Sequence, residues 1–461
     1  MHKIRIQIFF SLLGCLLIVL LAACGSGNPP TANGTPTSSS TPGATATATS
    51  GSPKSTPTSS TGSGSTPATP DGGTTPVPTT QTSCPAAGTT RAAVMATLAL
   101  GNHPNIVYIV NGPSGLGTLK RYDVTTGAKT EIVNLTGTYI SEAQVSADGQ
   151  WILFTSIVGK QAKLQLIRMD GQGLQTLYCP TTASNGADPA SALDYAQWSI
   201  NQRFVIFNSY TNQGAYLYLL NIQSGSVQRE FSSNSSLAYP PATWLDNTRV
   251  YLHGPMIDMP STAIYILDTS RGANQTASNL QLAYDANASG NGFCWSFDSS
   301  YDGTKLFTST CGTTPNPNGP GISSMRGPGN ISSRPATGGS ATSIYNNPDL
   351  AVTAVRVISN STLLFQIGNT SGTTSQNGLW KVGTNGSNAT RLTSTVGNLN
   401  QFSQYTWSNV SRDGSMYALQ VYNPSTRASA MLFGSMNGGT PTSFASISDG
   451  TMLETVGWTT M

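Results

Sequence analysis

Histidines and acidic residues, on which most catalytic sites depend, are scarce in this sequence. The 461 residues include three histidines and 19 acidic residues, and beyond the N-terminal region only His103 and His253 remain. No Gly-x-Ser-x-Gly nucleophile motif occurs. A pair of carboxylates for glycoside hydrolysis stays open as an alternative, although no acidic pair stands out. We therefore predict no catalytic residue, no cofactor and no metal site.

Three aspartates recur at similar places in the chain. Asp148, Asp302 and Asp413 each stand next to a glycine and before an apolar run. A ring of carboxylates can bind a metal ion, but single aspartates far apart in the chain are not a cluster, and no Asp-x-Asp-x-Asp calcium loop occurs. Aspartate also forms tight turns through its side-chain oxygen. We expect these residues to form turns.

The N-terminus has the pattern of an export signal. Lys3 and Arg5 precede an apolar run over residues 8–21, and the run ends in Leu-Ala-Ala-Cys24. A charged start, a short apolar core and small residues before a cleavage point are typical of a signal peptide. The ending resembles the bacterial lipobox, which implies removal of residues 1–23 and a diacylglyceryl group on Cys24. The alternatives are an ordinary secretory signal or an uncleaved anchor.

The composition of residues 24–83 predicts a flexible tether. Between residues 25 and 83, all but six of 59 positions are Ser, Thr, Pro, Gly or Ala. Such a segment cannot bury enough apolar surface to offset the entropy of ordering. As a flexible coil it would span on the order of 40–45 Å. Without residues 1–23 the chain carries 20 basic and 19 acidic residues, and this balance argues against nucleic-acid binding.

Beyond residue 100 the chain reads as all-β, with one hairpin pattern that recurs every 45–60 residues. Each copy has a small or aromatic start, a turn of the Asp-Gly type and an apolar strand, as in the ten residues from Val145 to Phe154. Later copies begin near residues 197, 243, 294, 356 and 406. Four short antiparallel strands per repeat is the composition of a propeller blade.

These repeats resemble the WD40-like blades of the TolB type, although the proline of that motif is absent. The resemblance covers roughly residues 104–461 and implies one β-propeller, for which we assign residues 84–461. Six hairpins and a partial first blade predict seven blades, with six or eight as alternatives. We expect the strand over residues 454–458 to complete the first blade. Residues 92–99 can also form a strand or a helix, and they are the alternative to residues 454–458 for the open position in the first blade. Propeller lyases that resemble this family use several histidines around a metal, and this chain lacks them.

Five tryptophans occupy the same place in five repeats: Trp198, Trp244, Trp295, Trp407 and Trp458. A stripe of tryptophans can stack on sugars, but an aromatic residue at one position of every blade is more typical of packing between blades. We expect packing.

Four cysteines remain once Cys15 and Cys24 are set aside, which permits two disulfides in an oxidising compartment. Cys294 and Cys311 flank one hairpin, so we predict a bridge between them, with buried free thiols as the alternative. Cys84 would then pair with Cys179.

The expected role is a non-catalytic binding or scaffolding module at the outer face of the bacterial cytoplasmic membrane. Its partner would be a protein, a peptide or a glycan of the cell envelope; the alternative is a carbohydrate-active enzyme. Function in repeat proteins often lies in insertions. The most prominent insertion spans residues 312–347 and offers Met325, Arg326, Arg334 and Tyr345 as a candidate binding loop.

Overall fold

The computed structural model describes residues 79–86, 88–112, 115–159, 161–180, 193–211, 214–233, 239–254, 263–286, 295–315, 322–399, 408–423, 425–448 and 451–461. The predicted signal peptide, Cys24 and residues 24–78 of the predicted tether lie outside these ranges. Within them, no helix has the length and apolar character needed to cross a membrane.

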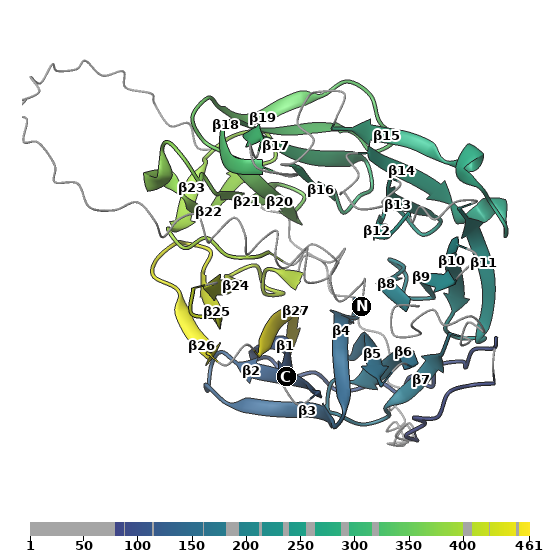
Figure 1. The fold of residues 1–461 in the computed structure, drawn as a ribbon. Helices are drawn as coiled ribbons and strands as arrows, with labels where there is room; N and C mark the ends of the chain where they lie inside the picture. The colour runs from purple at the N-terminus through teal and green to yellow at the C-terminus, as the bar shows by residue number, and fades with distance from the viewer. Residues whose placement is uncertain are drawn as a thin grey trace, which may run out of the picture. The chain divides into compact units, whose positions relative to one another are not determined.

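The described strands form seven antiparallel sheets arranged as the blades of a propeller (Figure 1). Blade 1 contains, from its inner to its outer strand, β27 (Met452–Thr460), β1 (Pro104–Gly112), β2 (Leu116–Asp123) and β3 (Lys129–Leu135). Blade 2 contains β4 (Thr138–Val145), β5 (Trp151–Val158), β6 (Gln161–Arg168) and β7 (Gln175–Tyr178). Blade 3 contains β8 (Leu193–Trp198), β9 (Phe204–Thr211), β10 (Gly214–Asn221) and β11 (Ser226–Ser232).

The remaining blades follow the same order. Blade 4 contains β12 (Pro241–Trp244), β13 (Arg249–His253), β14 (Ala263–Asp268) and β15 (Gln281–Asp285). Blade 5 contains β16 (Trp295–Ser299), β17 (Lys305–Pro315), β18 (Ile322–Pro335) and β19 (Thr342–Asn347). Blade 6 contains β20 (Val352–Ser359), β21 (Thr362–Ile367), β22 (Gly378–Gly383) and β23 (Thr390–Thr393). The described part of blade 7 contains β24 (Met416–Asn423), β25 (Ala428–Ser435) and β26 (Thr442–Ile447). Short 3-10 turns are η3 (Thr269–Arg271), η4 (Ala277–Asn279) and η6 (Thr374–Gln376).

The C-terminal strand closes the ring. β27 pairs antiparallel with β1 from Pro104 opposite Thr460 to Asn111 opposite Met452. The first blade is therefore built from both ends of the propeller, as the sequence predicts. This closure removes two free sheet edges, which would otherwise be open to pairing with other chains.

One turn motif joins the inner strand to the next strand in several blades. In blade 2, the Ser146 hydroxyl donates to Asp148 at 2.5 Å and accepts a hydrogen bond from the Trp151 amide at 3.0 Å. Asp148 also accepts the Gln150 amide at 3.0 Å. The same pattern links Ser199 with Asn201, Ser300 with Asp302, and Ser411 with Asp413. The recurring aspartates form turns, which confirms the prediction.

Tryptophans of the inner strands pack against the preceding blade. Trp198 contacts the core of blade 2, Trp244 that of blade 3, and Trp458 that of blade 7. Each of the three is at most 1% exposed. The predicted packing between blades is confirmed for these three, whereas the side chains of Trp295 and Trp407 lie outside the description.

Candidate functional site

The inner strands of the blades line the centre of the ring (Figure 1). Tyr139 and Met452 stand at the starts of β4 and β27, on two neighbouring blades. The Tyr139 hydroxyl donates to the Met452 sulfur at 3.3 Å. The starts of these two inner strands therefore lie close together, and the acidic residues described next are on the same two strands.

Glu454 is directed from blade 1 toward blade 2. Leu453 and Trp458 of the same strand pack against blade 7, and Val456, at a register shift in the pairing of β27 with β1, packs against blade 2. Successive residues of a strand point to opposite faces, so Glu454 takes the face opposite Leu453. Glu454 lies deep in the protein, and part of its side chain stays exposed.

Glu142 lies on β4 next to a β-bulge. The pairing of β4 with β5 shifts between Ile140 and Glu142, and such a shift reverses which face the following residues occupy. Ile140 and Ala143 contact the core between blades 1 and 2. Glu142 takes the other face, toward blade 3.

Three hydrogen bonds hold the Glu142 carboxylate. Its Oε1 accepts from the Thr155 hydroxyl at 3.1 Å and from the Ala196 amide at 3.1 Å, and its Oε2 accepts from the Tyr195 amide at 3.0 Å. Tyr195 has a φ of 55°, which non-glycine residues seldom adopt. The carboxylate therefore satisfies two backbone donors at an irregular point of β8. A cavity of about 10 Å³, roughly the space of one water molecule, lies beside Glu142 and Ala196.

Burial raises the pKa of both glutamates. Burial is the largest effect on Glu142 and, despite its three hydrogen bonds, raises its pKa to about 7. Burial and the charge of Glu142 raise the pKa of Glu454 to about 7. Burial, followed by the charge of Glu454, raises the pKa of Tyr139 to about 12. Burial therefore raises the pKa of both carboxyls to about 7, and the charge of Glu142 adds to this effect only at Glu454.

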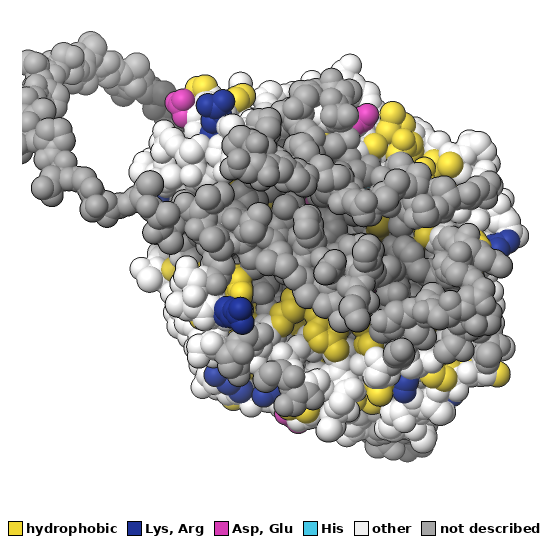
Figure 2. Space-filling model, viewed as in Figure 1, with side chains coloured by type: hydrophobic (Ala, Val, Ile, Leu, Met, Phe, Trp, Pro, Cys, Tyr) yellow, Lys and Arg dark blue, Asp and Glu magenta, His cyan; other side chains and the backbone are white. Residues whose placement is uncertain are grey.

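Glu454 has no hydrogen-bond or ion-pair partner among the residues that the structure describes. The described ion pairs all lie elsewhere. Described charged side chains are also few and scattered on the face shown in Figure 2. Glu454 therefore carries a carboxyl that no described side chain neutralises, and it lies close enough to Glu142 and Tyr139 for charge to act between them. This group of three residues and Met452 is called the channel acid site below.

The sequence interpretation of residues 312–347 as a loop is wrong, because most of this segment forms β-strands. Residues 312–315 pair with residues 322–326 and extend the hairpin of β17 and β18. The sequence interpretation took glycine and proline as signs of a loop. A side chain at Gly327 would approach the Pro348 carbonyl within 2.1 Å, and one at Gly329 the Leu350 carbonyl within 2.1 Å. These glycines permit close packing of the hairpin on blade 6.

The four residues of that candidate loop do not converge on one site. Met325 exchanges hydrogen bonds with Thr370 of blade 6. The Arg334 guanidinium lies over the Tyr284 ring at 4.1 Å, and the Tyr345 ring lies 5.0 Å from that of Phe365. Arg326 is exposed. A binding role for this segment stays a prediction.

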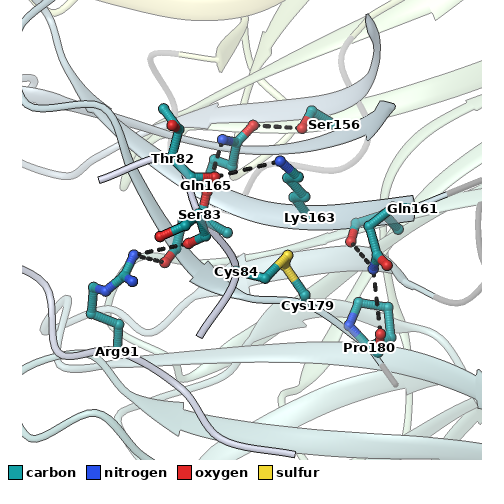
Figure 3. The surroundings of a disulfide bond; sticks show 12 residues. Thr82, Ser83, Cys84, Arg91, Ser156, Gln161, Lys163, Gln165, Cys179 and Pro180 are labelled. Atoms are coloured by element: carbon teal, nitrogen blue, oxygen red, sulfur yellow. Dashed lines mark hydrogen bonds between the residues drawn. A yellow bond between two sulfur atoms is a disulfide. The ribbon is translucent and has the colours of Figure 1, made fainter. Parts of the chain in front are cut away.

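A disulfide joins Cys84 to Cys179, as predicted, across 95 residues of sequence (Figure 3). Cys311 is also disulfide-bonded, and its predicted partner Cys294 lies outside the described residues.

His103 contacts Asp123 at 3.0 Å. His253 stacks edge-on against Phe297, and its pKa is lowered to about 4, mainly by burial. Among described residues, no three His, Cys, Asp or Glu side chains are placed to hold a metal ion.

No protein-family model matches the chain, and no curated protein matches it. Solved structures similar to it include TolB from Acinetobacter baumannii, at 13% identity and a TM-score of 0.39, with 61% of each chain covered. The propeller domain of the Trilobed protease from Pyrococcus furiosus is similar at 10% identity and a TM-score of 0.47, covering 78% of this chain and 99% of that one. An oligogalacturonate lyase in complex with manganese is similar at 9% identity and a TM-score of 0.43, covering 74% and 85%. The alignment thus spans less than two thirds of that TolB chain. These similarities concern the propeller fold alone.

Sequence reasoning missed the channel acid site. Glu142 and Glu454 are two ordinary acidic residues 312 positions apart, and only the ring closure makes them neighbours. One signal was present for Glu454, which stands on the predicted closing strand over residues 454–458 among apolar or neutral residues, whereas Glu142 lies just before the first predicted hairpin. A buried carboxylate costs free energy unless it is paired, so such positions merit attention in a propeller sequence.

Proposed function

We propose that this chain is an extracytoplasmic lipoprotein whose propeller is a non-catalytic binding module. Export and lipidation rest on the lipobox-like ending at Cys24, and the long Ser/Thr/Pro-rich segment supports a role as a spacer from the membrane. Mass spectrometry of the N-terminal peptide tests this part. A diacylglyceryl group on Cys24 supports it, and an unmodified Cys24 or an uncleaved signal overturns it.

The channel acid site supports a cationic ligand group, and the single observation that carries this proposal is the uncompensated Glu454. An ammonium group would donate a charge-assisted hydrogen bond to the Glu454 carboxylate and relieve the repulsion between Glu454 and Glu142. The Tyr139 hydroxyl adds a polar contact at the same place. The ligand is therefore an amine-bearing peptide or an amine-bearing glycan of the cell envelope.

Calorimetric titration of the purified chain tests the ligand class and separates its two sources. The probes are a tetramer of glucosamine and a lysine tripeptide, each compared with its fully N-acetylated form. Binding at least tenfold tighter to either free amine supports the proposal and identifies the source. Equal affinity for free and acetylated forms, or no binding by any probe, overturns it.

A carbohydrate-active enzyme is the second candidate, and the raised pKa of the two glutamates favours it. A carboxylic acid with a pKa near 7 can protonate a leaving group, while a second carboxylate acts as base or nucleophile. Release of reducing ends from a set of polysaccharides, including the glucosamine tetramer, tests it. Turnover that is lost in both E142Q and E454Q supports catalysis and overturns the purely binding role.

A further inference from the structure

The segment before the first strand forms a strap on the outside of the propeller. The strap is defined here as residues 79–103, of which all but residue 87 are described. Residues 92–99 were expected to be a strand or helix that competes for the place beside β1. They form neither, and β27 occupies that place.

The strap first binds the edge of β7, the outermost strand of blade 2. The Gln81 amide donates to the Leu174 carbonyl at 2.7 Å, and the Thr176 amide donates to the Gln81 carbonyl at 2.8 Å. The Arg91 amide donates to the Leu177 carbonyl at 2.9 Å. The strap therefore covers an edge that would otherwise offer free backbone groups.

Arg91 holds the bend between these two contacts (Figure 3). Its guanidinium donates to the carbonyls of Gln81, Ser83 and Thr176 at 3.2, 3.2 and 2.9 Å. Arg91 is also the one lysine or arginine in residues 79–103. The residue that a trypsin-like protease would recognise is thus occupied while the bend is in place.

The disulfide lies inside the same bend and adds a second covalent path. Cys84 of the strap is bonded to Cys179, just after β7, and the two Cα atoms are 5.7 Å apart. A cut in the backbone anywhere between residues 84 and 103 leaves residues before the cut attached to blade 2 through this bond. Cys84 is exposed, whereas Cys179 is 8% exposed.

We propose that the strap and its disulfide form a two-step release device, in which a cut at Arg91 separates the propeller from the residues before the cut only after the disulfide is reduced. A thiolate of a dithiol reductant attacks the exposed Cys84 sulfur, the S–S bond breaks, and its electron pair leaves on the Cys179 sulfur, which takes a proton. The second thiolate of the reductant then frees Cys84 as a thiol and leaves the reductant oxidised. A trypsin-like protease next adds water across the Arg91–Ala92 bond.

Limited trypsin digestion of the purified full chain tests this proposal, with and without dithiothreitol. Trypsin also recognises Lys54 in the segment before the strap, so the readout is the peptide that ends at Arg91. In the oxidised protein, this peptide should stay attached to the propeller on a non-reducing gel after the cut at Arg91. Reduction should speed the cut at least tenfold, and size-exclusion chromatography should then separate the propeller from the N-terminal fragment. The C84S variant should release the propeller without any reductant. The matched control C294S/C311S, which removes the other predicted bridge, should behave as the unchanged chain.

Three results would overturn the proposal. The first is an equal rate of cleavage at Arg91 in the oxidised and reduced chains. The second is a fragment that stays bound to the propeller after both steps. The third is unfolding of the propeller on reduction, measured by its tryptophan emission. The disulfide would then be needed for the stability of the whole fold and not only for holding the strap. The inference uses no residue of the channel acid site, so its failure leaves the proposed function standing.

Discussion

Glu454 and Glu142 lie on β27 and β4, the inner strands of the neighbouring blades 1 and 2, with Glu454 directed toward blade 2 and Glu142 toward blade 3. Each lies deep in the protein, and the charge of Glu142 contributes to the raised pKa of Glu454. Glu142 is held by three hydrogen-bond donors, whereas Glu454 has none among the described residues. The strand that completes the ring thus also carries a deep carboxyl that has no hydrogen-bond or ion-pair partner among the described residues.

The first prediction concerns stability against pH. Because the folded-state pKa of Glu454 is about 7 and its usual value is 4.5, the folded protein holds this proton more tightly than the unfolded chain. The contribution to stability is complete below about pH 4.5 and is lost as the pH rises through 7. E454Q should therefore stabilise the protein by about 1–2 kcal/mol at pH 8 and change little at pH 4. Thermal unfolding at both pH values measures this, and a loss of stability at pH 8 would contradict it.

The second prediction concerns Trp458, whose indole fills the space between blades 1 and 7. Truncation in W458A should lower the free energy of unfolding by about 3–5 kcal/mol, since a large cavity is left in a packed interface. W380A is the comparison, because Trp380 of β22 is only partly buried. Urea unfolding should show a smaller loss of unfolding free energy for W380A than for W458A. Equal losses would contradict the expectation that Trp458 stabilises the contact between blades 1 and 7.

The third prediction concerns the recurring turn. S146A removes a hydroxyl that donates to Asp148 and accepts from the Trp151 amide, so the variant should lose about 1 kcal/mol. S411A alters the same turn in blade 7 and should lose a similar amount. Urea unfolding of both variants is the measurement, and no change in either would show that the turn is not stabilised by its serine.

The fourth prediction concerns the disulfide of the strap. The bond closes a loop of 95 residues, and a bond across so long a loop restricts the unfolded chain strongly. C84S/C179S should therefore lower the free energy of unfolding by about 2–4 kcal/mol, with the propeller still folded. Unfolding of the variant and the unchanged chain, measured without reductant, tests this prediction. Equal unfolding midpoints would contradict it and would show that the bond holds the strap without stabilising the propeller.

Much of the fold was predictable because the blades repeat the same local sequence pattern. The serine–aspartate turns, the inner-strand tryptophans and the apolar second strands recur in the sequence, and they indicated the blades and the closing strand at residues 454–458. The hairpin of residues 312–347 was misjudged because glycine is ambiguous in sequence. Gly327 and Gly329 permit close packing on blade 6, and the same residue type also marks loops.

The channel acid site was not predictable from local patterns. Its residues acquire their character from ring closure, which places β27 beside β4, and from one bulge that turns Glu142 toward blade 3. A bulge has no reliable sequence signal, and burial of a carboxyl is a property of the assembled ring. The pairing of Cys84 with Cys179 was reached by elimination, whereas the strap that carries Cys84 was unforeseen.

The most direct test of the channel acid site is a comparison of E454Q with E131Q in amine binding. Glu131 is an exposed acidic residue of β3, so both variants lose one negative charge and only one of them alters the site. Calorimetry at pH 8 with the glucosamine tetramer and the lysine tripeptide should show at least a tenfold loss of affinity for E454Q and no loss for E131Q. Equal affinity in the two variants would contradict a binding role for the site.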